Sequence, residues 1–262
     1  MKDILKELEE RIHGTAMGAE RRDTGVVREI GDGVARIEGL TEARLSEMLD
    51  FGGGTMGLAL NLEESEVGAI ILGEYAGVRE GQEVRTTGRL LEVPAGRAML
   101  GRVVDALGRP LDGKGAIKAD EFCPVERVAP GIVHRQSVNQ PLETGIMAVD
   151  AMIPIGRGQR ELIIGDRSTG KTAIAVDAIL NQARLNRVAE AEGDTTYRPV
   201  FCIYVAIGQR QASVARTVKL LDEAGALPYC VVVSATAADS ATMQYLAPYS
   251  GTAIGEWFMD HG

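Results

Sequence analysis

Gly165-Asp166-Arg167-Ser168-Thr169-Gly170-Lys171-Thr172 matches the phosphate-binding pattern G-x-x-x-x-G-K-S/T. The glycines let the backbone curl so that several N–H groups point at one anion, and the helix that should follow carries partial positive charge at its start. Lys171 can reach the outer phosphates of a nucleotide, and the Thr172 hydroxyl can hold a Mg²⁺ ion. The loop therefore predicts a site for ATP or ADP together with Mg²⁺.

The two flanks of this loop agree with the motif. Residues 161–164 form a short apolar run that is typical of a buried strand. Residues 171–187 contain no Gly or Pro and are rich in Ala, Ile and Leu, which predicts a helix packed against a sheet. Strand, glycine loop and helix follow in the order that phosphate binding needs. The alternative is a chance match of the motif in a tight turn, which would not explain why a strand pattern precedes it and a helix pattern follows it.

The pattern continues as an alternation of strands and helices. We expect strands at residues 200–206 and 229–234, a helix over 211–224, and a polar surface loop at 188–197. Such alternation gives a parallel sheet with helices on its faces, and ligands bind beyond the carboxyl ends of the strands.

The N-terminal half has a different periodicity. Residues 23–90 alternate with period two between glycine-rich turns, which predicts a small closed or sandwich-like β domain. Residues 2–12 predict a short amphipathic helix, either a frayed terminal helix or a docking helix for a partner. Residues 91–160 are rich in loops, with a short helix near 146–152. We therefore divide the chain into 1–22, 23–90 and 91–262.

Composition restricts the classes of function. The chain has 262 residues and a formal net charge of −9, so it lacks the positive field that would attract nucleic acids and anionic membranes. No run reaches the roughly 18 apolar residues of a membrane span, and the charged start resembles neither a signal nor a transit peptide. Its three cysteines form no C-x-x-C pair, which fits a reducing compartment, and its three histidines are too scattered to indicate a metal site.

Several runs carry a family resemblance. Residues 145–150, 153–167 and 234–240 resemble the α subunits of F-type ATP synthases, as do 56–63, 107–115 and 135–138, in order along essentially the whole chain. The resemblance implies an α/β chain with a small antiparallel β-barrel, followed by a RecA-like P-loop parallel sheet flanked by helices. It also implies that the sheet is incomplete at its C-terminus, since no apolar strand ending in the Asp that holds Mg²⁺ follows residue 234.

The same resemblance implies a place in an assembly. Such α subunits alternate with β subunits in a hexameric ring, contact the γ and δ subunits, and connect indirectly with a membrane ion-channel sector. A peripheral position at the cytoplasmic face of the bacterial inner membrane is therefore expected, with no nucleic-acid partner. This chain departs from the family pattern at Ser168, where Gln is usual, and at Arg210, where Lys is usual.

One residue separates the subunit types. Catalytic β subunits place a Glu at the end of the strand that follows the phosphate-loop helix, and this chain has Gln209 there, as α subunits do. A Gln is neutral and cannot act as a general base, although it can hydrogen-bond a water or a phosphate. We expect a site that binds MgATP, with Gln209 beside it, and that turns it over slowly or not at all. Gln209 without a ligand contact, and Arg167 in a structural ion pair, remain the alternatives to roles in the site.

Two other functions make different predictions. A catalytic ring ATPase of a rotary or protein-export motor would carry a carboxylate at position 209 and a G-G-x-x-x-G-K loop, which Gln209 and Asp166-Arg167 do not match. A hexameric RNA-translocating motor would carry basic and aromatic residues on its barrel. Residues 23–90 contain only Phe51 and Tyr75 as aromatic residues.

Overall fold

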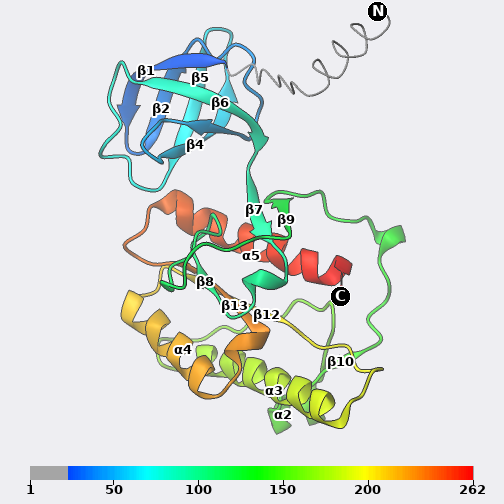
Figure 1. The fold of residues 1–262 in the computed structure, drawn as a ribbon. Coiled ribbons are helices and arrows are strands. Elements are labelled where there is room, and N and C mark those ends of the chain that lie inside the picture. Colours follow the sequence, from blue (N-terminus) through cyan, green and yellow to red (C-terminus); the bar gives the residue numbers. More distant parts are fainter. Residues whose placement is uncertain (1–22, 262) are drawn as a thin grey trace, which may run out of the picture. The chain divides into compact units, whose positions relative to one another are not determined.

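The computed structural model describes residues 23–261, so the helix predicted over residues 2–12 lies outside the described residues. Contacts between Cα atoms divide the chain into two compact units. The described part of the first unit comprises residues 23–71 and Tyr75–Leu90, and that of the second comprises Leu72–Glu74 and residues 91–261. Figure 1 follows the chain through both units.

The first unit is a closed antiparallel barrel, which confirms the predicted fold class for this part. Its strands follow one another around the barrel in the order β1-β2-β5-β4-β3-β6. Their bounds are β1 (Thr24–Gly31), β2 (Val34–Glu38), β3 (Glu47–Asp50), β4 (Met56–Leu62), β5 (Glu66–Leu72) and β6 (Glu83–Leu90).

The period-two pattern sorts side chains between the barrel core and its surface. In β2, Ala35 and Ile37 are fully buried while their neighbours in the strand are exposed. In β4, the inward positions are taken by small residues, because a Cβ atom on Gly57 would collide with the ring of Phe51. Ala59 is buried in the core, and its neighbour Leu60 therefore lies on the outer surface, since side chains alternate along a strand.

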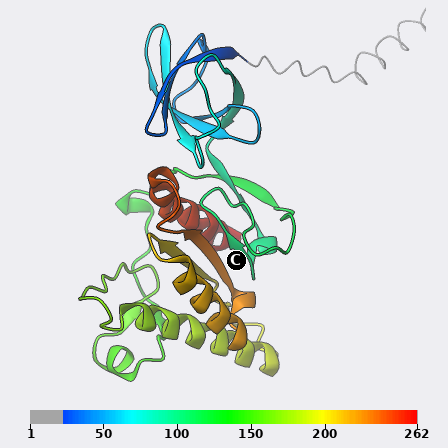
Figure 2. The same ribbon diagram turned by 90° about the vertical axis from the view of Figure 1, so that its left-hand side faces the viewer.

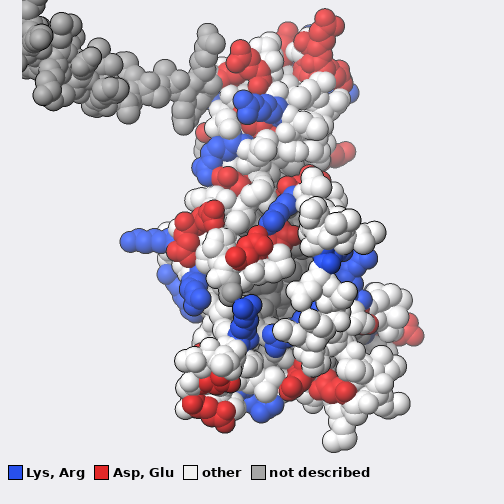
Figure 3. Space-filling model, turned by 90° about the vertical axis from the view of Figure 1, so that its right-hand side faces the viewer, with Lys and Arg blue, Asp and Glu red and all other residues white. Residues whose placement is uncertain are grey.

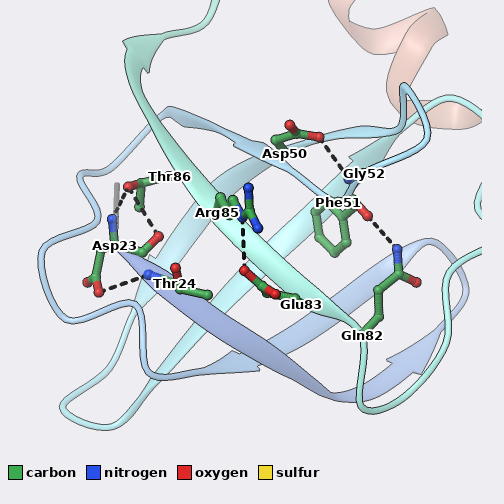
Figure 4. A network of polar contacts seen from close by, with 9 residues as sticks. All are labelled: Asp23, Thr24, Asp50, Phe51, Gly52, Gln82, Glu83, Arg85 and Thr86. Carbon is green, nitrogen blue, oxygen red and sulfur yellow. Dashed lines mark hydrogen bonds and ion pairs between the residues drawn. The ribbon is translucent and has the colours of Figure 1, made fainter. Parts of the chain in front are cut away.

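Polar contacts fasten the ends of the barrel strands (Figure 4). The Asp23 backbone N–H donates to Thr86 Oγ1 at 2.9 Å, which ties the entry of β1 to β6. Gln82 Nε2 donates to the backbone carbonyl of Phe51, and Gly52 N–H donates to Asp50 Oδ1 at 2.7 Å. These contacts satisfy backbone groups at the turns that would otherwise be left unpaired.

The second unit is built on a parallel sheet of the order β12-β13-β8. β12 (Cys202–Ile207) and β13 (Cys230–Ala235) pair in parallel over six residues, close to the ranges expected from the sequence. β8 (Val103–Val104) adds a short parallel strand that comes from the segment expected to be mostly loop. All six residues of β13 are buried, as a central parallel strand requires.

Helices cover both faces of this sheet, which confirms the predicted fold class. α3 (Lys171–Glu192) and α4 (Gln211–Glu223) pack on the face that carries Tyr204 and Val232. α5 (Ala241–His261) packs against β12 and β13 from the other face, as Figure 2 shows in red. Within residues 23–261, no helix combines the length and the apolar character needed to cross a membrane.

Short elements complete the second unit. β7 (Glu92–Ala95) pairs antiparallel with β9 (Glu121–Pro124), and β10 (Pro141–Leu142) pairs antiparallel with β11 (Ile155–Gly156). The expected short helix is present as α2 (Met147–Met152). The remaining elements are 3-10 turns, at η1 (Arg97–Met99), η2 (Ile132–His134) and η3 (Leu227–Tyr229).

Two local predictions were wrong. Residues 161–164 form no strand, and Leu162 and Ile164 are 80% and 82% exposed. An apolar run becomes a strand only when neighbouring strands take up its N–H and C=O groups, and no described strand pairs with this one. Residues 188–192 are helical, not loop, because α3 buries Ala189 in its last turns and ends only before Gly193, which has the left-handed conformation (φ 67°).

Candidate functional site

The predicted phosphate loop is an exposed turn that leads directly into a long helix. Residues 165–170 are all exposed, and α3 begins at Lys171, which places the loop at the start of a 22-residue helix. Gly170 has a φ of 91°, which only glycine adopts without strain, and this turn sets the direction of the helix. A Cβ atom on Gly165 would lie 2.8 Å from Thr169 Oγ1, so glycine is needed for the loop to close on itself.

The start of α3 offers free backbone donors. No side chain caps the helix, and no acidic residue lies in its first turn. The first N–H groups of a helix have no partner within it, and together with the helix dipole they favour an anion at that end. Thr172 is exposed in this same turn, where its hydroxyl is available. The geometry therefore fits a bound phosphate.

Lys171 is folded back over the loop. Its Nζ donates to the carbonyl oxygen of Gly165 at 2.6 Å and also to the carbonyl oxygen of Asp166. Thr169 Oγ1 donates to the same Asp166 carbonyl at 2.8 Å, which tightens the turn. The ammonium group thus occupies the inside of the loop, and an incoming phosphate would replace neutral carbonyl partners with charged oxygens, which are stronger acceptors.

Ser168 holds an unusual backbone conformation. Its φ is 62°, in the left-handed region where a residue with a Cβ atom is disfavoured. Ser168 and its neighbour Arg167 are both exposed, and among residues 23–261 Arg167 forms no ion pair. The loop therefore carries one strained residue and one guanidinium whose donors face solvent.

Gln209 lies at the carboxyl end of β12, two residues after the strand. Its side chain is half-buried, and its Nε2 donates to Tyr204 Oη at 3.4 Å. Its backbone carbonyl accepts from the Ala237 N–H at 3.0 Å, which links the segment after β12 to the segment after β13. In the described part of the chain, no hydrogen bond joins Gln209 to the phosphate loop. The structure thus brings residues 165–172 together and leaves Gln209 without a direct contact to them.

A buried amide fixes the helix that carries the loop. Asn186 in α3 is fully buried, and its Nδ2 donates to the Val200 carbonyl at 2.9 Å. Its Oδ1 accepts from the Val200 N–H and from Tyr197 Oη, each at 3.0 Å. These three bonds attach α3 to the segment entering β12. The sequence analysis missed this residue, because nothing local distinguishes it from Asn181, the other Asn of α3.

A second anchor lies earlier in α3. Gln182 Nε2 and Asn181 Nδ2 both donate to the carbonyl oxygen of Glu143. Thr144 and Gly145 follow Glu143 directly and bond to Asp150. The Asp150 carboxylate accepts from Thr144 Oγ1 and from the backbone N–H groups of both residues, and these bonds lower the pKa of its carboxyl group. The segment before the loop is therefore held against the middle of α3.

Metal-binding groups are sparse around this site. Among residues 23–261, no group of three or more His, Cys, Asp or Glu side chains could hold a metal ion. Thr172, at the start of α3, can offer Mg²⁺ a hydroxyl oxygen. Cys202 and Cys230 lie opposite each other on β12 and β13, where burial raises the pKa of their thiols to about 11 and about 12, which makes them poor metal ligands.

Comparison with known proteins agrees with this architecture. The beta-barrel domain of the ATP synthase alpha/beta family matches residues 21–88, and the nucleotide-binding domain of the same family matches residues 145–262. ATP synthase subunit alpha of Dehalococcoides mccartyi is 55% identical over 260 residues, which cover 99% of this chain and 49% of the relative. ATP synthase subunit alpha of Cupriavidus necator and subunit alpha 1 of Nitrosospira multiformis are each 54% identical, over 99% of this chain and 48% of the relative.

The chain spans about half the length of the curated relatives it matches. Nearly all of the barrel falls within the first matched domain, and β12, β13 and the phosphate loop fall within the second. The chain therefore belongs to the ATP synthase alpha/beta family, and these relatives are alpha subunits.

Proposed function

We propose that the chain acts as the nucleotide-binding alpha subunit of a rotary F-type ATP synthase, whose own site holds MgATP or MgADP without catalysing its hydrolysis. The complex would couple ATP synthesis and hydrolysis to ion flow across a membrane. The observation that carries this proposal is Gln209 just after β12, in the same unit as a loop equipped to bind phosphate. An amide has no proton to accept or release near neutral pH, so it cannot activate water as a carboxylate does.

Phosphate binding would rest on three groups of this chain. The uncapped N–H groups at the start of α3 face the anion, and Lys171 moves from the Gly165 and Asp166 carbonyls to the outer phosphates. Arg167 is free to add a further charged contact from the exposed side of the loop. Removal of the Lys171 ammonium should weaken nucleotide binding about 10- to 100-fold, the usual value for losing charged hydrogen bonds.

Mg²⁺ would be held mainly by the nucleotide. Thr172 supplies a hydroxyl ligand, and phosphate oxygens and water would fill most of the other positions, as is usual for this ion. Bound there, the ion neutralises phosphate charge. The role we assign to the protein is to orient the phosphates with the loop. Because Gln209 is not a general base, the protein would not activate a water molecule for hydrolysis.

The proposal extends to partners and location, with the family match as its support. We propose alternation with β subunits in a hexameric ring, contacts with the γ and δ subunits, and an indirect connection to the membrane ion-channel sector. The chain would then lie at the cytoplasmic face of the bacterial inner membrane. A nucleic-acid partner is not part of this proposal, since the net charge is −9 and the face in Figure 3 intersperses acidic and basic side chains.

The test separates binding from turnover. In the assembled complex with the β-subunit sites inactivated, we expect wild type to bind a fluorescent ADP analogue and to release no phosphate from ATP above background. Lys171→Met should lose binding by the factor above, while Lys118→Met, an exposed lysine outside the loop, should not. Substantial phosphate release by wild type would refute the non-catalytic role and favour a catalytic ring ATPase. Unchanged binding by Lys171→Met would refute the assigned site.

A further inference from the structure

A cavity of about 530 Å³ lies within the second unit, between α4, the carboxyl end of β13 and the segment 111–114. Its walls are largely apolar, formed by Val103, Leu111, Val214, Val218 and Leu227. None of residues 165–172 lines it, and neither does Gln209. Its volume and its combination of apolar walls with polar groups fit a small-molecule site.

One hydroxyl that lines this cavity, that of Ser234, has no partner within the described residues. Ser234 is 4% exposed, and it pairs in register with Ala206, so its side chain lies on the sheet face that α4 covers. Ser234 lines the cavity, and no group among residues 23–261 exchanges a hydrogen bond with its hydroxyl. The neighbouring Thr236 differs, because its hydroxyl donates to Asp239 at 2.8 Å. A hydroxyl can both donate and accept, so a ligand in the cavity could form a hydrogen bond with Ser234.

The charges around the cavity favour an anion. Lys114, Lys219 and Asp222 line it, and the charge of Asp112 is already neutralised by the bidentate guanidinium of Arg102 at 2.7 and 2.9 Å. Lys219 lies 3.5 Å from Glu223, but this pair is exposed on a helix surface and is weak. Lys114 Nζ donates to the neutral carbonyl oxygen of Gly101 at 3.1 Å and so keeps its positive charge. Two ammonium groups and the one unpaired carboxylate of Asp222 therefore leave a net positive charge around the cavity.

We propose that this cavity is a second small-molecule site, which takes a monoanionic amphipathic ligand. The apolar body would lie against Val214 and Val218, a hydrogen-bonding group would satisfy Ser234, and the negative charge would lie near Lys219. Gln211 also lines the cavity, two residues after Gln209, so the ligand would contact the start of α4. The site is independent of the nucleotide-binding role proposed above.

The first experiment tests the Ser234 contact with a matched pair of probes. The full chain is titrated calorimetrically with 6-hydroxy-2-naphthoate and with 2-naphthoate, which lacks the hydroxyl group. Ser234→Ala should weaken binding of the hydroxylated probe about fivefold, the value of one hydrogen bond, and leave 2-naphthoate unchanged. Ser213→Ala, on an exposed serine of α4 that does not line the cavity, should change neither. An equal effect on both probes would overturn the contact.

The second experiment tests the location and the charge. Ala215 is exposed at the cavity, so Ala215→Trp should block it without disturbing the core, whereas Ala212→Trp on the same helix should not. Binding should also be weaker for uncharged 2-naphthol than for 2-naphthoate, and Lys219→Met should reduce that preference. The absence of binding by either anionic probe, or binding that survives Ala215→Trp, would overturn the proposal. A tighter binding of 2-naphthol would overturn the assigned charge.

Discussion

Asn186 attaches the loop-bearing helix to the segment entering β12 through three hydrogen bonds, so Asn186→Leu should make the second unit easier to unfold. The substitution keeps the branching at Cγ but removes three hydrogen bonds, two with the Val200 backbone and one with Tyr197 Oη. At about 1 kcal/mol for each bond, the free energy of unfolding should fall by about 3 kcal/mol. The Val200 backbone is only half-buried, so water can partly replace the lost partner and limit the penalty.

Urea denaturation followed by the fluorescence of Trp257, the only tryptophan, reports the second unit in which it lies. Tyr197→Phe is the matched variant, because it removes one of the three bonds and keeps the ring, and it should cost about 1 kcal/mol. A loss below about 0.5 kcal/mol for Asn186→Leu, or an equal loss for both variants, would refute the reasoning.

Three further changes test other features. Ser168→Gly should leave the fold intact or stabilise it by up to about 1 kcal/mol, since it relieves the left-handed backbone, whereas Ser168→Val should destabilise it; thermal unfolding distinguishes the two. Arg102 holds the pKa of the Asp112 carboxyl below its usual range, so this pair stabilises the fold above the unfolded value of about 3.9 and loses that effect as the pH falls through the lower folded pKa. The stability gap between wild type and Asp112→Asn, about 3 kcal/mol at neutral pH, should therefore narrow below about pH 4, and a gap independent of pH would contradict this. Gly57→Val should destabilise the barrel by about 1–3 kcal/mol through its clash with Phe51. Unfolding followed by circular dichroism measures this loss, and an unchanged unfolding midpoint would contradict the packing of Gly57 against Phe51.

Local signals in the sequence were sufficient where a residue's own conformation decides the structure. The start of α3 at Lys171 follows from Gly170 and the run of helix formers behind it, and the buried apolar runs of β12 and β13 identify them as parallel strands. The period-two alternation of residues 23–90 likewise predicted a closed or sandwich-like β domain, and the structure is a closed barrel.

Contacts between distant residues account for what the sequence did not predict. Residues 161–164 look like a strand, yet without a neighbouring strand their apolar side chains stay exposed. β8 has only two residues, and only its pairing with β13 defines it. The attachment of α3 through Asn186 depends on Val200, fourteen residues away, and no local sequence pattern indicates this contact. The strained conformation of Ser168 is similarly a property of the closed loop.

The fate of ATP held at the phosphate loop tests the central claim most directly. Labelled ATP is loaded into the assembled complex with the β-subunit sites inactivated, unbound label is removed, and the bound nucleotide is identified over time. We predict that the wild-type chain retains the label as ATP, and that Lys171→Met retains little label of any kind. Conversion of the bound label to ADP by the wild-type chain would contradict the account, because it would show that Gln209 does not prevent hydrolysis.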